Sequence, residues 1–269
     1  MIIRHDIDPE LYLTDADEFP AVFAIATTQE EIFTPYDKID ELLKPSLIPA
    51  IQTKPKFYTC CDGMGTLIRP SWILTAAHVA TALSAGAEIH IKKRTYTIRE
   101  ILLHPGFLDY EIEDCKTEDY ENKDLARDDV ALVQLDGDVE SIQPLPLYQR
   151  KDELKKVVTF VGRGDFGNGL IGPDQVDGKM RIATNRVEET NDQWLISKFD
   201  TPPKCTTLEG IPGPGDSGGP ALIKTDEGWA IAGISAGQRS LNFGEGHYGV
   251  WEYYTRVSFQ LDWINATIA

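Results

Sequence analysis

The chain has 269 residues, 42% of them hydrophobic, and can therefore bury a sizeable core in one large domain or two small ones. Its longest apolar runs fall far short of the roughly 20 residues that a helix needs to cross a bilayer, so we expect no membrane insertion. Its formal net charge of −17, from 26 basic and 43 acidic residues, argues against nucleic acids and anionic membranes as partners.

Short apolar or alternating stretches separated by Gly, Pro and Asp indicate a β-rich fold. We expect strands in AVFAIAT from Ala21, MGTLI from Met64, EIHIKKRTYTIREILL from Glu88, DVALVQL from Asp129, KVVTFVG from Lys156, WLISKF from Trp194, PALIK from Pro220 and WAIAGISA from Trp229. The clearest helical signal is SFQLDWINATI near the C-terminus, where Phe259, Trp263 and Ile264 share a face and Ser258 caps the start. The prediction is an all-β chain with a C-terminal helix.

Residues 109–129 carry ten carboxylates against three basic side chains and show no sustained apolar period. This composition predicts a long solvated loop. Two alternatives are a calcium site within this loop and an acidic patch that recruits basic substrates. No other cofactor is expected.

The four cysteines, Cys60, Cys61, Cys115 and Cys205, are too few for a disulfide-scaffolded fold. None has the paired spacing typical of a zinc site. We expect one or two structural disulfides or plain buried thiols, with a connectivity that the spacing does not determine.

The stretch GPGDSGGP places Ser217 among glycines and prolines, which is typical either of a turn or of a nucleophile. Gly215, Gly218 and Gly219 leave room for a substrate carbonyl to approach the backbone. The N–H groups of Gly215 and Ser217 are candidate donors of an oxyanion hole.

A nucleophilic serine needs a base and an orienting acid, because its hydroxyl is unreactive at its free pKa. His78, in SWILTAAHVA, follows a β-like apolar stretch and two small residues, so it is placed to face a cleft. Asp129, in ARDDVALVQL, directly precedes an apolar strand, where a carboxylate can be partly buried and still accept a bond from an imidazole. Asp128 should point the opposite way.

These three motifs, TAAH, DVAL and GDSGGP, occur in the order found in the trypsin-like (chymotrypsin-fold) serine peptidases, and the chain resembles that family from about Phe19 to its end. Weaker marks of the same family are GMGTLI, LHPGF, VGRG, GISAG and YTRV. GRGDFGNGLIGP and LEGIPGPGDSGGPAL look similar to bacterial members.

The resemblance implies a single peptidase domain over residues 1–269, built of two six-stranded antiparallel β-barrels and a C-terminal helix. The expected bounds are 19–140 for the first barrel, 150–256 for the second and 257–269 for the helix. By position, Ser217 is the nucleophile, His78 the general base and then acid, and Asp129 the residue that fixes the imidazole tautomer. The resemblance further implies protein or peptide substrates, cleavage through an acyl-enzyme, a monomer, and a secreted or periplasmic location. The opening MIIRHDIDPE has no signal peptide, so either none exists or it was removed before this numbering begins.

In this family the aspartate before the serine, here Asp216, receives the new N-terminal amine after activation cleavage. The usual Ile-Val-Gly-Gly start is absent, so we predict that a processed terminus at Ile2 or Ile3 pairs with Asp216. Two of the family's disulfides are also absent, because Gly63, Val79 and Gly213 stand where cysteines are usual.

The family resemblance places the specificity pocket around the residue six positions before the serine, here Ile211. Ile211 offers no charge to a buried cation and favours apolar or small substrate side chains. Glu252 is a possible carboxylate from the far wall, and it keeps a preference for Arg or Lys open. The remaining predicted wall residues are Pro212, Gly213, Pro214, Ser235, Ala236 and Gly237. A non-catalytic binding protein on the same fold is the other alternative.

Overall fold

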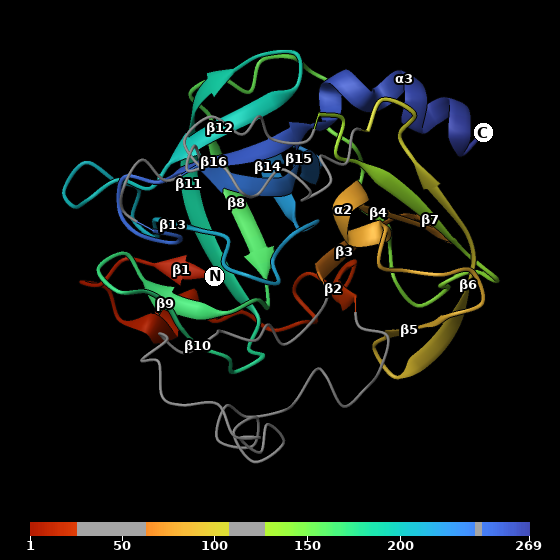
Figure 1. Cartoon of the computed structure of the whole chain (residues 1–269), viewed down its shortest axis with the longest axis horizontal. Coiled ribbons are helices and arrows are strands. Elements are labelled where there is room, and N and C mark those ends of the chain that lie inside the picture. The colour runs from red at the N-terminus through yellow and green to blue at the C-terminus, as the bar shows by residue number, and fades with distance from the viewer. Residues whose placement is uncertain (26–62, 108–126, 240–243) are drawn as a thin grey trace, which may run out of the picture.

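The computed structural model describes residues 1–25, 63–107, 127–239 and 244–269, which form two six-stranded antiparallel β-barrels side by side and a C-terminal helix (Figure 1). This confirms the fold class predicted from the sequence. No helix in the described residues is long and apolar enough to cross a membrane. The acidic segment falls almost wholly outside these residues, as do Cys60, Cys61 and Cys115.

The barrel nearer the C-terminus closes in the order β11-β12-β16-β15-β14-β8, with every neighbouring pair antiparallel. Inward side chains fill it, and the rings of Phe160 and Tyr254 stack at its centre with centroids 4.7 Å apart. Its strands are β8 (Val157–Gly162), β11 (Arg181–Thr190), β12 (Trp194–Lys198), β14 (Pro220–Thr225), β15 (Gly228–Arg239) and β16 (Trp251–Arg256).

The other six strands pair in the order β2-β3-β4-β7-β6-β5, and the two outer strands, β2 and β5, approach each other. They are β2 (Val22–Ile25), β3 (Gly63–Arg69), β4 (Trp72–Thr75), β5 (Glu88–Ile91), β6 (Arg94–Leu103) and β7 (Ala131–Leu135). A one-turn helix, α2 (Ala77–Ala80), follows β4 and carries His78.

The N-terminus enters a third, small sheet of order β10-β9-β1-β13. Its central strand, β1 (Ile2–Ile3), pairs with β9 (Phe166–Asn168) on one side and β13 (Gly210–Ile211) on the other. The outer strand is β10 (Gly172–Gln175), and a short 3-10 helix, η1 (Pro9–Tyr12), follows β1. This sheet ties the first residues of the chain to the segment that precedes Ser217.

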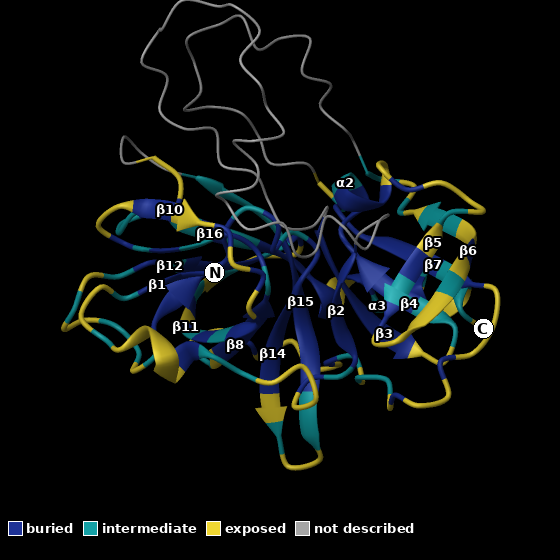
Figure 2. Ribbon diagram, turned by 90° about the horizontal axis from the view of Figure 1, so that it is seen from below, coloured by how far each residue is buried: buried dark blue, intermediate teal, exposed yellow. Residues whose placement is uncertain are grey.

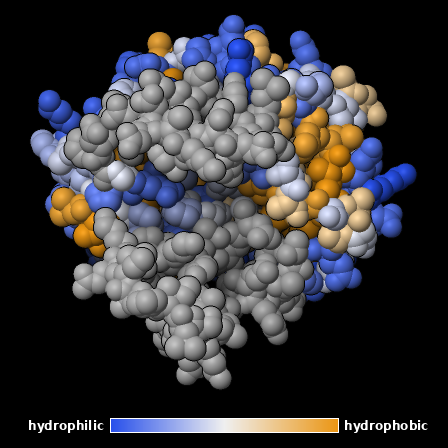
Figure 3. Space-filling view, in the orientation of Figure 1, coloured by the Kyte–Doolittle hydropathy of each residue, from blue (hydrophilic) through white to orange (hydrophobic). Residues whose placement is uncertain are grey.

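Buried residues run through the middle of both barrels, while strand ends and turns are exposed, as the β14–β15 hairpin shows (Figure 2). One cluster of buried apolar side chains extends from the first barrel into the second and includes Val161, Leu222 and Ile231. The described part of the face in Figure 3 is mostly hydrophilic, with apolar residues gathered on its right side. The two barrels therefore share a core across their junction.

The C-terminal helix α3 (Val257–Thr267) lies within the 257–269 expected for it and includes the SFQLDWINATI segment except its last residue. The predicted cap at Ser258 is wrong: the N-cap is Arg256, without a side-chain hydrogen bond, and Ser258 lies inside the helix. The predicted face is also wrong in part, because Phe259 is 41% exposed whereas Ile264 is fully buried. The hydroxyl of Ser258 does not cap the helix, because it donates to a buried side chain instead.

That side chain belongs to Glu153, whose buried carboxylate joins the end of β16 to the start of α3. Arg256 donates to Glu153 through Nη2 at 2.6 Å and Nε at 3.2 Å, and Ser258 Oγ donates to it at 2.6 Å. Glu153 is wholly buried and Arg256 is 7% exposed. A buried charge with its counter-charge removed is strongly destabilising, so this pair fixes where β16 ends.

We predict that Glu153→Gln lowers the free energy of unfolding by about 3–5 kcal/mol, because it leaves the buried guanidinium of Arg256 without a counter-charge. Denaturant unfolding measures this change. The exposed Glu140→Gln is the matched control and should stay within about 0.5 kcal/mol of the wild type. Equal unfolding curves for the two variants would contradict the prediction.

Candidate active site

His78 and Asp129 meet at the junction of the two barrels. The Nδ1 atom of His78 lies 2.6 Å from Asp129 Oδ2, and the main-chain N–H of His78 donates to Oδ1 at 2.9 Å. Because an ionised carboxylate only accepts, this contact places the proton on Nδ1 and leaves Nε2 as the basic nitrogen. The side chain of His78 is 36% exposed and that of Asp129 only 2%. The arrangement presents an oriented imidazole to solvent above a buried acid.

The backbone around Asp129 is held from the opposite barrel. The hydroxyl of Thr255, in β16, donates to the carbonyl of Asp129 at 2.9 Å, and both residues are buried. Since Asp129 belongs to the segment before β7 in the first barrel, this bond crosses the junction. The imidazole orientation therefore depends on contacts from both barrels.

Ser217 lies on the second barrel's side of the same junction. Its carbonyl accepts from the N–H of Met64 in β3 at 2.7 Å, and the next residue, Gly218, donates to the carbonyl of Ser235 at 2.9 Å. Gly218 has a φ of 79°, and a Cβ there would lie 2.3 Å from Thr75 Oγ1. Only glycine fits, so the serine segment packs directly on the strand end that leads to His78.

Gly63 lies between helix α2, which carries His78, and the segment that contains Ser217. A Cβ at this position would lie 2.7 Å from Val79 Cγ1 and 2.9 Å from the carbonyl oxygen of Ser217. Val79 is the residue after His78, so the helix that carries the imidazole and the serine segment both contact one glycine. The structure thus gathers the predicted catalytic residues His78, Asp129 and Ser217 at one place.

Asp216 is buried and binds the N-terminal ammonium group. Its Oδ2 lies 2.7 Å from the nitrogen of Met1, and it accepts the N–H groups of Gly164 at 2.6 Å and Gly213 at 2.9 Å. Met1 also donates to the carbonyl of Asp165 at 2.5 Å. These bonds fix the chain immediately before Ser217, including Gly215, which is buried and has a φ of 84°.

The sequence predicted that a processed terminus at Ile2 or Ile3 pairs with Asp216, whereas the ammonium that lies at Asp216 in the structure is that of Met1. The side chain of Ile2 instead packs in a small buried cluster with Phe199, Ile211 and Val250. Met1 directly precedes Ile2 and Ile3, and the pairing of these two residues with β9 and β13 brings the amine of Met1 to Asp216. Whether an isoleucine terminus binds Asp216 after processing stays a prediction.

The predicted pocket residues are buried to different extents. Ile211, Pro212, Gly213 and Ser235 are buried, whereas Ala236 and Gly237 are partly exposed in β15. Glu252, in β16, is 1% exposed; Ser235 Oγ lies 3.3 Å from its Oε1, and Oε2 has no hydrogen-bond partner in the described residues. Burial raises the pKa of Glu252 well above its ordinary value. Desolvation therefore disfavours the charged form of this carboxyl group.

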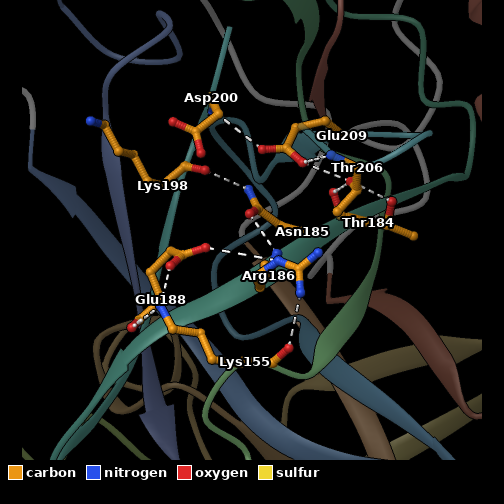
Figure 4. A network of polar contacts seen from close by, with 9 residues as sticks. All are labelled: Lys155, Thr184, Asn185, Arg186, Glu188, Lys198, Asp200, Thr206 and Glu209. Carbon is orange, nitrogen blue, oxygen red and sulfur yellow. Dashed lines mark hydrogen bonds and ion pairs between the residues drawn. The ribbon is translucent and has the colours of Figure 1, made fainter. Parts of the chain in front are cut away.

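A polar network supports the segment that leads into Ile211 (Figure 4). Asn185 Nδ2 donates to the carbonyls of Lys198 at 3.0 Å and Gly210 at 3.2 Å. The carboxylate of Glu209 accepts from the N–H of Thr206 at 2.6 Å and from that of Asp200 at 3.2 Å. Burial raises the pKa of Glu209 despite these bonds. The network fixes residues 198–210 against β11, directly before Ile211 in the chain.

Comparison with known proteins agrees with this geometry. The family model described as Trypsin matches residues 50–264. The chain belongs to the trypsin family of serine endopeptidases. Trypsin-family relatives include Tryptase of Mus musculus, 28% identical over 233 residues, and Chymotrypsin-C of Bos taurus, 28% identical over 216 residues. Each match covers 75% of this chain and 76% of the relative.

A third trypsin-family relative is Protein masquerade of Drosophila melanogaster, 26% identical over 221 residues, which cover 76% of this chain and 20% of that protein. These relatives are all animal proteins, so the comparisons do not support the likeness to bacterial members that the sequence suggested. The glycine-rich segments on which that likeness was based have a role in local packing here. Gly213, for example, lies against the carbonyl of Asp165.

The described residues hold no cluster of three or more His, Cys, Asp or Glu side chains that could bind a metal ion, and Cys205 is a free thiol. The predicted calcium alternative concerns residues 109–129, of which only Arg127, Asp128 and Asp129 are described. It stays a prediction.

We predict that a Gly-Ser extension placed before Met1 lowers both the stability and the reactivity of Ser217. The extension moves the ammonium away from Asp216, and breaking a buried ion pair costs about 3–5 kcal/mol. Denaturant unfolding measures the first effect, and the rate of covalent labelling by a phosphonofluoridate measures the second. The same two residues added after the exposed Ala269 are the control. Unchanged unfolding and labelling in the N-terminal variant would show that the contact contributes nothing.

Proposed function

We propose that this chain hydrolyses peptide bonds in protein or peptide substrates with Ser217 as nucleophile, His78 as general base and then acid, and Asp129 as the orienting acid. The observation that carries the proposal is the contact of 2.6 Å between His78 Nδ1 and the buried Asp129, with Gly218, next to Ser217, packed on Thr75, three residues before His78. Nε2 takes the proton of the serine hydroxyl as the acyl-enzyme forms and returns it to the leaving amine.

The N–H groups of Gly215 and Ser217 would hold the developing oxyanion. Three neighbouring N–H groups are already engaged: Asp216 donates to Gly213, Gly218 to Ser235 and Gly219 to Asp216. These bonds, together with the ion pair at Asp216, make the segment rigid before substrate arrives. Preorganised donors of this kind are worth about 3 kcal/mol each.

For the specificity pocket we propose a preference for apolar or small side chains. Ile211 is apolar and completely buried, and desolvation disfavours the charged form of Glu252, so both residues favour a substrate side chain without charge. The second candidate, a preference for Arg or Lys, is favoured by one observation. The unpartnered Oε2 of Glu252 would accept a hydrogen bond from a cationic side chain that reached it.

Membership of the trypsin family supports secretion from the cell, as expected from the resemblance. A monomeric state and the division into barrels at 19–140 and 150–256 remain proposals on the same basis. The strands that form the two barrels fall within these bounds, whereas β1 lies before them.

We predict that Ser217→Ala lowers kcat for peptide-amide hydrolysis by about 10⁴-fold or more, because the nucleophile is lost while the fold is kept. Asp129→Asn should lower kcat by about 10⁴-fold through the wrong imidazole tautomer. Ser84→Ala, at an exposed site, is the control. Labelling by a phosphonofluoridate gives an independent readout. A wild-type chain that neither cleaves peptide amides nor reacts with the phosphonofluoridate would support the alternative of a non-catalytic binding protein.

Hydrolysis of peptide amides that differ only before the cleaved bond tests the pocket. We predict that wild type prefers apolar or small side chains and that Glu252→Gln keeps the same ranking, because a neutral carboxyl group and an amide are similar in shape and charge. Glu227→Gln, in the exposed β14–β15 turn, is the control. Cleavage after Arg or Lys that rises with pH and disappears in Glu252→Gln would establish the second candidate instead.

A further inference from the structure

Two adjacent aspartates precede β7, and their carboxylates point in different directions, as the sequence predicts. Asp129 faces His78, whereas Asp128 faces α3 and the turn between β11 and β12. Strand alternation is not the cause. Asp128 has a φ of 52°, which is uncommon for a residue other than glycine, and its carbonyl accepts from the N–H of Val130 at 2.8 Å. The chain turns sharply immediately before Asp129.

Three hydrogen bonds hold Asp128 in this conformation. Gln193 Nε2 and Gln260 Nε2 both donate to its Oδ1, at 2.9 Å and 2.8 Å, and its main-chain N–H donates to Gln193 Oε1 at 3.0 Å. Gln193 is 9% exposed and Gln260 only 2%. Buried amide groups need partners, so each glutamine depends on Asp128 as much as Asp128 depends on them.

Asp128 precedes β7 of the first barrel, whereas both glutamines lie on the side of the second barrel and the C-terminal helix. Gln193 lies in the β11–β12 turn and accepts the N–H of Arg256 at 2.9 Å, and Gln260 lies on α3. The neighbour of Arg256, Thr255, is the residue that donates to the carbonyl of Asp129. The two aspartates are therefore anchored to one stretch of the second barrel, one by its carboxylate and the other by its carbonyl.

Another neighbour of the Asp128 carboxylate is His104, whose Nδ1 lies 3.9 Å from Oδ2. That nitrogen accepts the N–H of Gly106 at 3.0 Å, so it carries no proton toward Asp128. Burial also lowers the pKa of His104, and its ring packs edge-on against Trp263. The side chain of Asp128 therefore acts by accepting two amide hydrogen bonds on Oδ1. The side-chain carbonyl oxygen of an asparagine could accept the same two bonds.

We propose that Asp128 is a positioning residue for the reaction: by binding Gln193 and Gln260 across the junction, it holds the main chain so that the carboxylate of Asp129 stays on His78. This rests on the proposed function, in which Asp129 orients the imidazole. Asp128 itself touches neither His78 nor Ser217 in the contacts described above. Its effect is on geometry, and a displacement of about 1 Å near reacting groups can cost up to about 100-fold in rate.

The test compares Asp128→Ala with Asp128→Asn, each assayed on a peptide amide cleaved by the wild type. Asp128→Ala should lower kcat about 10- to 100-fold with little change in KM, because the catalytic geometry is altered and not the binding of substrate. Asp128→Asn should restore most of kcat. Proton NMR gives a second readout: the downfield resonance of the His78 Nδ1 proton should weaken or shift in the alanine variant and return in the asparagine variant.

Asp138→Ala, in the exposed segment after β7, is the control for loss of one negative charge. Rates are divided by the concentration of reactive Ser217 from phosphonofluoridate titration, so misfolded protein does not count. Gln260→Met, which keeps the volume but loses the amide donor, should shift kcat and the resonance in the same direction as Asp128→Ala. The proposal is overturned if Asp128→Ala keeps the wild-type kcat and resonance, or if Asp128→Asn is as impaired as Asp128→Ala. Failure of the proposed function would look different, because the wild type itself would show no hydrolysis dependent on Ser217.

Discussion

The ion pair between the Met1 ammonium and Asp216 is the contact on which the serine segment depends. Both groups are almost wholly buried, and neither tolerates such burial without the other. The same carboxylate binds the N–H groups of Gly164 and Gly213, so one charge organises three separate stretches of chain. Strand β1 then carries this constraint into the small sheet with β9 and β13. The terminus thereby becomes an interior structural element.

The second constraint lies at the junction of the barrels, where Asp129 and Ser217, the proposed orienting acid and nucleophile, come from different halves of the chain. Their alignment cannot be set within either barrel alone. Thr255 holds the Asp129 carbonyl from β16, while Met64 of β3 donates to the carbonyl of Ser217. Each barrel thus holds a residue of the other at the site. A shared apolar core behind these bonds keeps the two surfaces in register.

The catalytic candidates could be predicted from the sequence because His78, Asp129 and Ser217 each sit in a short local motif. Strands that consist of short, nearly continuous apolar runs, such as β7 and β14, were predicted because such runs are visible in the sequence itself. Strand β11 was not, because its inward positions include Arg181 and Asn185, which interrupt the alternation of apolar residues. Contacts such as Glu153 with Arg256 join residues 103 positions apart, and only the fold brings them together. The helix cap failed because Ser258 binds Glu153 instead of the helix end.

Gly63 and Val79 contact each other where related proteins commonly join two cysteines. Here van der Waals packing around a glycine takes the place of a covalent bond beside His78. Near Gly213, another position without its usual cysteine, the Met1 amine lies close to where a side chain would begin. At these two places the packing beside His78 and Ser217 involves no sulfur atom, so neither oxidation nor reduction can alter it there.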